Sequence, residues 1–403
     1  MDLAPSPAQE RFRAELRDWL ATAVTWGDGD RPPQFADLDD EVAFLRQWQR
    51  TLAGGGWVGV HWPSEYGGRG LGPIESFIVA EELARVRSPE LVGRIGVNLV
   101  GPTLLAHGSD AQKQRWLPAI LDAREIWCQL FSEPGAGSDL ASLTTRALRD
   151  TDGGWVLDGA KVWTSYAQYA DWGLCLARTS PDQPKTKGIT AFAVDMRAPG
   201  VTVRPLVQMT GDREFNEVRL DEVRVPDDHR VGDVDAGWRV AGSTLAGERA
   251  TNPRQLVIHL QAVDELVRLA AATGADADPR IRRRLAMSYA DVRIFQLHTW
   301  RALSRLEHGE RLGPEGSMVK LHWSEASKRL HALAMDVLGD AAPLWRGAAG
   351  NPGDGRWQRA WLYYQASSIW AGTNEIQRNV IGERVLGLPR ERVPQRSGGG
   401  SLQ

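Results

Sequence analysis

The spacing of apolar residues changes twice along this chain of 403 residues, and the change limits the folds open to it. In the first part, apolar residues recur at helical spacing, and Ser6 and Ser109 each begin a capping-box sequence. In the second part, short runs alternate with a period of two, which is typical of β-strands. The helical spacing then returns. We therefore expect a helical domain at 1–125, a β-domain at 126–235, a helical bundle at 236–392 and a flexible tail at 393–403.

Shorter patterns predict the individual elements. Within the β-domain, Asp158-Gly159 separates two short apolar runs and predicts a two-residue hairpin. The run from Gly54 to Gly59 satisfies G-x-G-x-x-G, but a helical pattern precedes it and a loop follows. A dinucleotide fingerprint needs the opposite order, so we interpret this run as a helix end and a turn. Helices are expected at 41–52, 74–84, 256–271, 281–307, 318–338 and 358–385, and further strands at 172–177, 189–194, 201–203 and 218–225.

Composition excludes several function classes. The net charge of −3 gives no basic surface for nucleic acid. No apolar run approaches the 18 or so residues of a membrane span, and the first residues do not resemble a signal peptide. Cys128 and Cys175 have no metal-ligand spacing and fit a reducing, cytoplasmic location, so no metal site is expected. The 17 tryptophans serve either core packing or an aromatic pocket, and the sequence leaves both open.

Two polar motifs interrupt these patterns. Residues 370–378 read Trp-Ala-Gly-Thr-Asn-Glu-Ile-Gln-Arg, and the Ala-Gly-Thr centre breaks a helical run beside a hydroxyl, an amide and a carboxylate. Residues 131–139 read Phe-Ser-Glu-Pro-Gly-Ala-Gly-Ser-Asp, in which the glycines let the backbone approach a ligand and the serines supply hydroxyls. Donors held at fixed positions in this way suit a flavin ring and a thioester carbonyl.

Together and in this order, the two motifs resemble those of the acyl-CoA dehydrogenase family, over roughly residues 5–390. The resemblance implies an N-terminal helical domain, a middle β-barrel domain and a C-terminal four-helix bundle. It also implies FAD-dependent α,β-dehydrogenation of an acyl-CoA thioester to a trans-2-enoyl-CoA, with hydride transfer to the flavin and electrons passing to an electron-transferring flavoprotein. Two alternatives stay open: a flavoprotein of this fold with an oxidase or elimination reaction, and a non-catalytic subunit of a heteromeric dehydrogenase.

The resemblance also assigns roles to residues in several segments of the chain. The acyl-CoA is expected to contact Ser138, Arg249, Ala371 and Gly372, with the N–H of Ala371 polarising the thioester carbonyl. The residues expected to bind FAD are Leu130, Ser132, Gly137, Ser138, Trp163, Ser165, Leu338, Gly339, Thr373 and Glu375.

The catalytic base is expected at a less common family position. Many members carry a Glu just before the Gly-Thr of the C-terminal motif, where this chain has Ala371. Other members carry a Glu followed by Arg on an earlier helix, and Glu248-Arg249 matches that pair. The resemblance therefore implies that Glu248 removes the α-proton, although a solvated helix-face charge is the alternative. Pro253 is expected to kink the same helix.

Two departures from the family concern the contacts between subunits. An Arg-x-x-Phe-Gly segment that reaches the neighbouring flavin has no equivalent between Thr273 and Arg284. A Gln-x-x-Gly-Gly segment appears as Asp-Val-Leu-Gly-Asp at 336–340. We expect a homotetramer, because both motifs on this chain's own side are intact, and keep an α₂β₂ assembly as the alternative. The apolar helix positions expected in that interface are Leu285, Tyr289, Val292 and Phe295.

Overall fold

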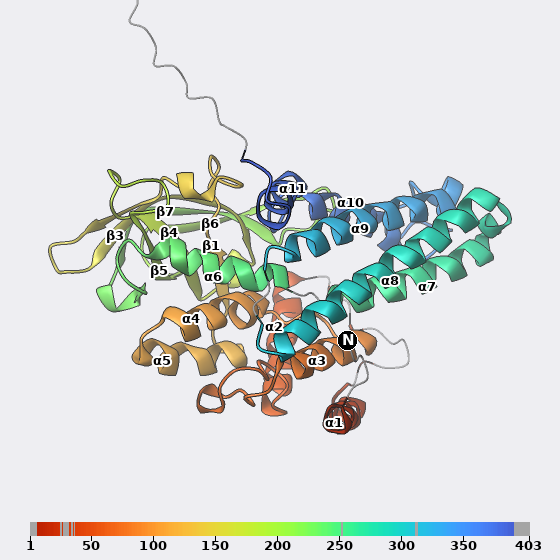
Figure 1. The fold of residues 1–403 in the computed structure, drawn as a ribbon, viewed down its shortest axis with the longest axis horizontal. Helices are drawn as coiled ribbons and strands as arrows, with labels where there is room; N and C mark the ends of the chain where they lie inside the picture. Colours follow the sequence, from red (N-terminus) through yellow and green to blue (C-terminus); the bar gives the residue numbers. More distant parts are fainter. Residues whose placement is uncertain are drawn as a thin grey trace, which may run out of the picture.

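The computed structural model describes residues 6–24, 26, 32–33, 35, 37–250, 253–310 and 313–390, without the side chains of 246–250. Helices come first, a sheet follows and longer helices end the chain, which confirms the expected fold class. Figure 1 shows the sheet at one end of the molecule, the bundle of α7–α10 at the other, and α11 between them. No helix in the described ranges is long and apolar enough to cross a membrane.

Five helices precede the sheet. Capping boxes at Ser6 and Ser109 start the first and the last of them, as predicted. The second ends at Gly54, and a Cβ on Gly55 would lie 2.7 Å from the ring of Trp19, so the glycine-rich run is a helix end and turn, as predicted. These helices are α1 (Pro7–Ala23), α2 (Leu38–Gly54), α3 (Pro73–Arg85), α4 (Gly101–His107) and α5 (Asp110–Leu121).

Eight described strands form one sheet in the order β6-β7-β3-β2-β4-β5-β8, with β1 parallel to β4. The central strands β4 and β5 are buried on both faces and form much of the core of this region. The strands are β1 (Trp127–Leu130), β2 (Arg146–Arg149), β3 (Trp155–Ser165), β4 (Trp172–Arg178), β5 (Ile189–Asp195), β6 (Val201–Leu206), β7 (Phe215–Val225) and β8 (Arg230–Val231).

The hairpin predicted at Asp158-Gly159 is wrong. β3 continues through this dipeptide as one strand and pairs with β7 on both sides of it. The register shifts between Leu157 and Gly159, which marks a β-bulge. A Cβ on Gly159 would lie 2.5 Å from Oγ1 of Thr145, so the glycine is needed for a close approach to the neighbouring strand.

The C-terminal helices form a bundle around an apolar core. Leu285, Val292 and Phe295 are buried in that core, whereas Tyr289 is exposed, so three of the four residues expected at a subunit interface pack inside this chain. Pro253 begins a new helix, with residues 251–252 outside the described part. The helices are α6 (Gly237–Ala250), α7 (Pro253–Thr273), α8 (Pro279–Glu307), α9 (Gly316–Leu338), α10 (Arg356–Gln365) and α11 (Asn374–Val380).

A buried ion pair fixes the loop after β1 to the sheet. Nζ of Lys161 donates hydrogen bonds to Oε1 of Glu133 at 2.9 Å and to the carbonyls of Phe131 and Leu176 at 3.2 and 2.8 Å. Both side chains are almost fully buried. Burial alone would raise the pKa of the Glu133 carboxyl, but the charge of Lys161 and the hydrogen bonds to the carboxylate lower it to about 2. The carboxylate is therefore ionised at neutral pH.

Removing Lys161 alone should be strongly destabilising. Lys161→Met leaves the Glu133 carboxylate buried without its partner, which should lower the free energy of unfolding by about 3–5 kcal/mol. The double variant Lys161→Met/Glu133→Gln should lose less than the sum of the two single changes. Urea unfolding measures all three. Arg124→Met is the control, because its pair with Asp122 is exposed and should contribute at most about 1 kcal/mol. Equal losses in Lys161→Met and the control would contradict this account.

Two histidines are buried in the helical bundle. Nε2 of His259 lies 2.6 Å from Oγ of Ser327, and Nδ1 lies 2.7 Å from the carbonyl of Gln255. Nδ1 of His331 lies 2.7 Å from the carbonyl of Ser327. Burial lowers the pKa of His259 to about 4 and that of His331 to about 3. Both rings are therefore neutral in the native bundle at neutral pH.

The bundle should lose stability on acidification before the carboxylates titrate. In the unfolded chain a histidine has a pKa near 6.5, so below that pH the unfolded state binds protons that the native state does not. This stability is complete above about pH 6.5 and falls as the pH drops towards the native pKa values, by up to about 1.4 kcal/mol per pH unit for each histidine. Urea unfolding between pH 7.5 and 5 measures the slope. His331→Phe keeps a ring beside Tyr364 and should reduce the slope, whereas an unchanged slope would rule out His331 as its source.

Candidate functional site

The C-terminal motif folds into a strained turn between α10 and α11. Ala371 and Gly372 have positive φ values of 53° and 83°. Nε2 of Gln377 donates hydrogen bonds to the carbonyls of both residues, at 3.0 and 3.2 Å, and a Cβ on Gly372 would lie 2.5 Å from that atom. Thr373 caps α11 by accepting a hydrogen bond from the N–H of Ile376. Among the backbone hydrogen bonds of the described residues, none uses the N–H of Ala371.

Asn374 anchors this turn to α9. Its Oδ1 accepts hydrogen bonds from Nζ of Lys320 at 3.0 Å and Oγ of Ser324 at 2.9 Å, and its Nδ2 donates to Oε1 of Glu325 at 2.6 Å. Asn374 is buried, whereas the next residue, Glu375, is exposed and faces Arg378. The amide therefore has a structural role, and the carboxylate of Glu375 is open to solvent.

The loop at 131–139 begins at the buried end of β1 and runs to the surface. Leu130 is fully buried, and the carbonyl of Ser132 accepts a hydrogen bond from the N–H of Val162 on β3 at 2.9 Å. Gly137 and Ser138 are exposed, and a Cβ on Gly137 would meet no atom within 4 Å. The backbone of this part of the loop is therefore accessible beside the sheet, where a ligand could approach it closely.

Trp163 lies beside this loop in an unusual conformation. It has a φ of 60°, the register between β3 and β7 shifts around it, and 62% of its surface is exposed, whereas Trp155 on the same strand is buried. The ring of Phe215 packs edge-on against it at 6.2 Å. The adjacent Thr164 is buried, and its hydroxyl has no hydrogen-bond partner among the residues that the structure describes. A positive φ in a tryptophan costs energy, so the surrounding structure must hold the residue in this conformation.

Most of the predicted cofactor residues gather in these two places. Leu130, Ser132, Gly137, Ser138, Trp163 and Ser165 belong to the loop after β1 and the adjoining end of β3, and Thr373 and Glu375 belong to the C-terminal turn with Ala371 and Gly372. Elsewhere, Arg359 on α10 binds Asp212, in the loop before β7, at 2.6 Å.

Leu338 and Gly339 lie apart from both places. Leu338 is buried in the bundle core, and Gly339 is exposed at the end of α9 with a φ of 52°. Ser324, which binds the C-terminal turn, lies 14 residues earlier on α9, or about 21 Å along the helix axis. Leu338 and Gly339 are therefore separated from the turn within this subunit, and their predicted contact with FAD stays a prediction.

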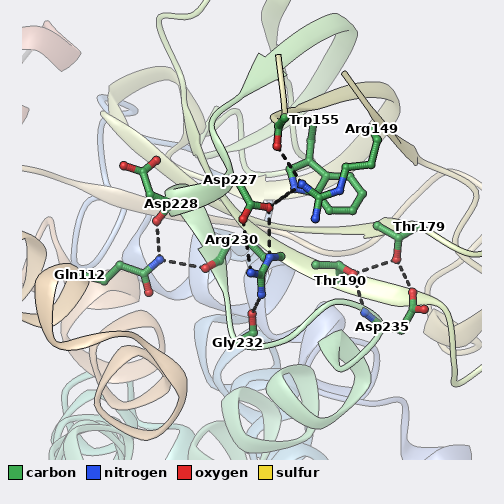
Figure 2. Close-up of polar contacts among 11 residues, drawn as sticks. Gln112, Arg149, Trp155, Thr179, Thr190, Asp227, Asp228, Arg230, Gly232 and Asp235 are labelled. Atoms are coloured by element: carbon green, nitrogen blue, oxygen red, sulfur yellow. Dashed lines mark hydrogen bonds and ion pairs between the residues drawn. The ribbon is translucent and has the colours of Figure 1, made fainter. Parts of the chain in front are cut away.

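The helix that carries Glu248 and Arg249 is held firmly at its start. Figure 2 shows contacts of Asp227 and Asp235, which both lie between β7 and α6 and bind this segment to the sheet. Asp227 accepts hydrogen bonds from Nε1 of Trp155 at 2.8 Å and from Arg149 at 3.0 Å. A second contact, from Nε2 of Gln112 on α5 to the carbonyl of Asp228, is 2.7 Å long.

Asp235 sets the first turn of α6. Its carboxylate accepts hydrogen bonds from Thr179 and Ser180 at 2.6 and 2.8 Å, and its N–H donates to Oγ1 of Thr190 at 2.8 Å. A Cβ on Gly237 would lie 2.8 Å from the carbonyl of Ile189, so the helix begins in direct contact with β5.

Further along, α6 packs against α4. The buried hydroxyls of Thr244 and Thr103 lie 2.8 Å apart, and Nε2 of His107 lies 2.8 Å from Oγ of Ser243. Glu248 and Arg249 follow one turn later on the same helix. Their side chains lie outside the described part of the structure, so their predicted roles stay predictions.

Neither a cluster of metal-ligating side chains nor a reactive thiol is found among the described residues. No group of three or more potential metal ligands occurs among the described residues. Burial raises the pKa of the thiols of Cys128 and Cys175, the latter to about 11, so neither is a nucleophile at neutral pH.

The sequence patterns missed the residues that hold these segments in place. Asp227 and Asp235 sit in a loop without a motif, and their partners are distant in sequence. The sequence could have indicated a buried partner for Lys161, since this charged residue interrupts an otherwise alternating strand pattern. The same holds for Arg94, because it interrupts the apolar segment from Leu91 to Val97.

Comparison with known proteins agrees with this organisation. Family models for the acyl-CoA dehydrogenase N-terminal, middle and C-terminal domains match residues 6–124, 128–223 and 235–386. The chain is 41% identical over 393 residues to acyl-CoA dehydrogenase IpdE1 of Mycobacterium tuberculosis, covering 95% of this chain and 98% of that protein.

Solved structures show the same fold. The structure described as Tcur3481-Tcur3483 steroid ACAD has a TM-score of 0.83 at 30% identity, covering 97% of this chain and 100% of that one. The ChsE4-ChsE5 complex from Mycobacterium tuberculosis has a TM-score of 0.80 at 31% identity, with the same coverage. With all three domain models matched and a relative similar over almost its whole length, the chain belongs to the acyl-CoA dehydrogenase family and is an oxidoreductase acting on acyl-CoA.

Proposed function

We propose that this protein catalyses the FAD-dependent α,β-dehydrogenation of an acyl-CoA thioester to a trans-2-enoyl-CoA and passes the electrons to an electron-transferring flavoprotein. The observation that carries this proposal is a pair of strained residues, one on β3 beside the loop at 131–139 and one in the C-terminal motif. Trp163 and Ala371 have φ values of 60° and 53° although neither is a glycine. Such strain persists only where the surroundings enforce it, and it concentrates at functional sites.

The residues around these two positions suit a flavin. The exposed face of Trp163 can stack on a flat ring, and the hydroxyls of Ser132, Ser165 and Thr373 can bind its polar edge. When bound, FAD supplies the acceptor for the hydride that leaves the β-carbon. Ser138 and Gly137 are exposed, where the coenzyme A part would lie. We propose that Arg249 binds that part as well.

In this proposal, Glu248 and Ala371 together bring about removal of the α-proton. The N–H of Ala371, which forms no backbone hydrogen bond with the described residues, would donate to the thioester oxygen and stabilise the charge that develops there. The described carboxylates nearest to this turn already have partners, since Glu325 binds Asn374 and Glu375 faces Arg378. This supports Glu248, in the last turn of α6, as the group that removes the α-proton.

Flavin reduction tests the proposed function. The purified protein should contain FAD, and a good acyl-CoA substrate should bleach its visible absorbance without oxygen. Glu248→Gln should keep the fold and the flavin but lower the rate of bleaching about 10²–10⁴-fold, because an amide cannot accept the α-proton.

Glu383→Gln is the control for this experiment. Glu383 pairs with Arg390 near the end of the described chain, so its loss should not affect bleaching. Full activity in Glu248→Gln would disprove the assignment of the base. A protein that binds no FAD, alone or after reconstitution, would disprove the dehydrogenase function.

We further propose that the enzyme assembles through the outer face of α8. Met287, Ile294 and Leu297 are 54%, 42% and 50% exposed, and they recur at seven- and three-residue spacing along one side of this helix. A second copy of this chain is the favoured partner, because the motifs at 131–139 and 370–378 are intact in this chain. Two of the similar structures, Tcur3481-Tcur3483 steroid ACAD and the ChsE4-ChsE5 complex, carry the names of two proteins, and they support a mixed assembly as the alternative.

Mass and flavin content decide between these assemblies. Light scattering on the protein expressed alone should give a tetramer with one FAD per chain. Leu297→Glu places a charge in the proposed interface and should shift the mass towards smaller species. Leu148→Glu is the matched control, since Leu148 is also exposed but lies on β2, and its mass should not change. A flavin-free monomer in the unmutated protein would contradict the homotetramer.

A further inference from the structure

Arg94 is a cation with spare hydrogen-bond donors inside the protein. It lies between α3 and the helical turn Gly96–Val100. Its Nε is buried without a hydrogen-bond partner, and the nearest carboxylate oxygen, on Glu90, is 3.5 Å away. Among the described residues, no group accepts a hydrogen bond from its guanidinium at hydrogen-bonding geometry. Still, 27% of the side chain remains accessible, so a ligand can reach it.

The other polar groups near Arg94 leave its donors unused. Tyr166 lies under the guanidinium, with the ring centre 5.6 Å from its central carbon, and presents an aromatic face rather than an acceptor. The carboxylate of Asp212 is bound by Arg359 at 2.6 Å. Burial raises the pKa of the Glu214 carboxyl, whose Oε2 lies 3.4 Å from the hydroxyl of Tyr166. Asp212 is therefore paired with another cation and Glu214 is disfavoured as an anion, which leaves Glu90, at 3.5 Å, as the carboxylate that pairs with Arg94.

Arg94 also lies between the two halves of the candidate site. Tyr166 follows Trp163 by three residues at the end of β3. The charge of Arg94 acts on the phenols of both Tyr166 and Tyr363, and the ring of Tyr363 packs 5.0 Å from that of Trp370, the neighbour of Ala371. In the proposed function, the thioester binds at Ala371 and the reacting carbons face Trp163. An acyl group in this position would also lie near Arg94, which comes from the N-terminal helical domain.

A buried guanidinium with free N–H groups is costly unless an acceptor binds it. Its planar fork fits a carboxylate or carbonyl oxygen, and a hydrocarbon chain cannot satisfy it. We propose that Arg94 binds an oxygen atom on the acyl group, away from the thioester. The substrate is then a CoA thioester whose acyl part carries a carboxylate or a ketone rather than plain hydrocarbon. This inference rests on the proposed function and specifies its substrate class.

Three acyl-CoA thioesters of equal chain length, ending in a methyl group, a ketone and a carboxylate, test the proposal. Calorimetry on the FAD-loaded protein measures their Kd values, and flavin bleaching measures kcat/KM. The better oxygenated thioester should have a Kd roughly 10–100-fold lower than the methyl-ended one and a kcat/KM higher by a similar factor, as expected for a hydrogen bond to a charged group. Whichever oxygenated thioester gives the larger ratio identifies the oxygen recognised.

Variants of Arg94 show whether this preference comes from its side chain. In Arg94→Gln the ratio of oxygenated to methyl-ended thioester should fall towards one. Arg94→Lys keeps the charge without the planar fork and should give an intermediate ratio. Arg124→Gln is the matched control, because its guanidinium pairs with Asp122 on the surface, and it should keep the ratio of the unmutated protein.

The outcomes separate this inference from the proposed function. Equal binding of all three thioesters by the unmutated protein overturns the role of Arg94, and this result does not depend on whether the variants fold. An undiminished preference in a folded Arg94→Gln overturns it as well. Preferential binding of an oxygenated thioester without flavin reduction supports the role of Arg94 and overturns the dehydrogenase function instead.

Discussion

The buried contact of Lys161 with Glu133 is the constraint on which the candidate site depends. One ammonium group binds the loop after β1, through Phe131 and Glu133, and the strand β4, through Leu176. Lys161 itself lies on β3, two residues before Trp163. A single buried cation thus sets the distance between the serine-containing loop and the strained tryptophan. Its burial is costly, so the contact is better explained by this positioning than by a gain in stability.

Much of the fold could be predicted from periodicity, because helix and strand patterns depend on neighbouring residues. The capping boxes at Ser6 and Ser109 are contacts within one turn, and the structure confirms both. The hairpin predicted at Asp158-Gly159 was wrong because contacts with a distant strand decide the structure there. The dipeptide has a local preference for a turn, but pairing with β7 on both sides keeps the strand extended. Tertiary pairing here overrides a local signal.

The site shows the same division between local and distant contacts. Trp163, Ala371 and Thr373 could be proposed as site residues because the resemblance to the family assigns roles to them. The residues that place them could not, since their partners come from other parts of the chain: Asp235 binds Thr179, and Arg94 meets Tyr166. Pairs of residues so far apart in the chain produce no regular spacing that a sequence pattern could reveal. An arginine within an apolar segment or a lysine within a strand indicates that a partner exists but does not identify it.

In the proposed function, the backbone of Ala371 acts as the donor, so the base can come from another element of the chain. Ala371 is held at positive φ by its backbone, through the contact of Gln377 with its carbonyl, and not by its own side chain. A donor made from a backbone N–H is therefore independent of the residue at this position. The carboxylate can then come from another element, provided that element is fixed. The start of α6 meets this condition, because Asp235 and Gly237 bind it to β5 and Thr244 binds it to α4. In the proposed function, a base on a different element from the donor needs a helix that is held in place, and the contacts of Asp235 and Thr244 hold α6.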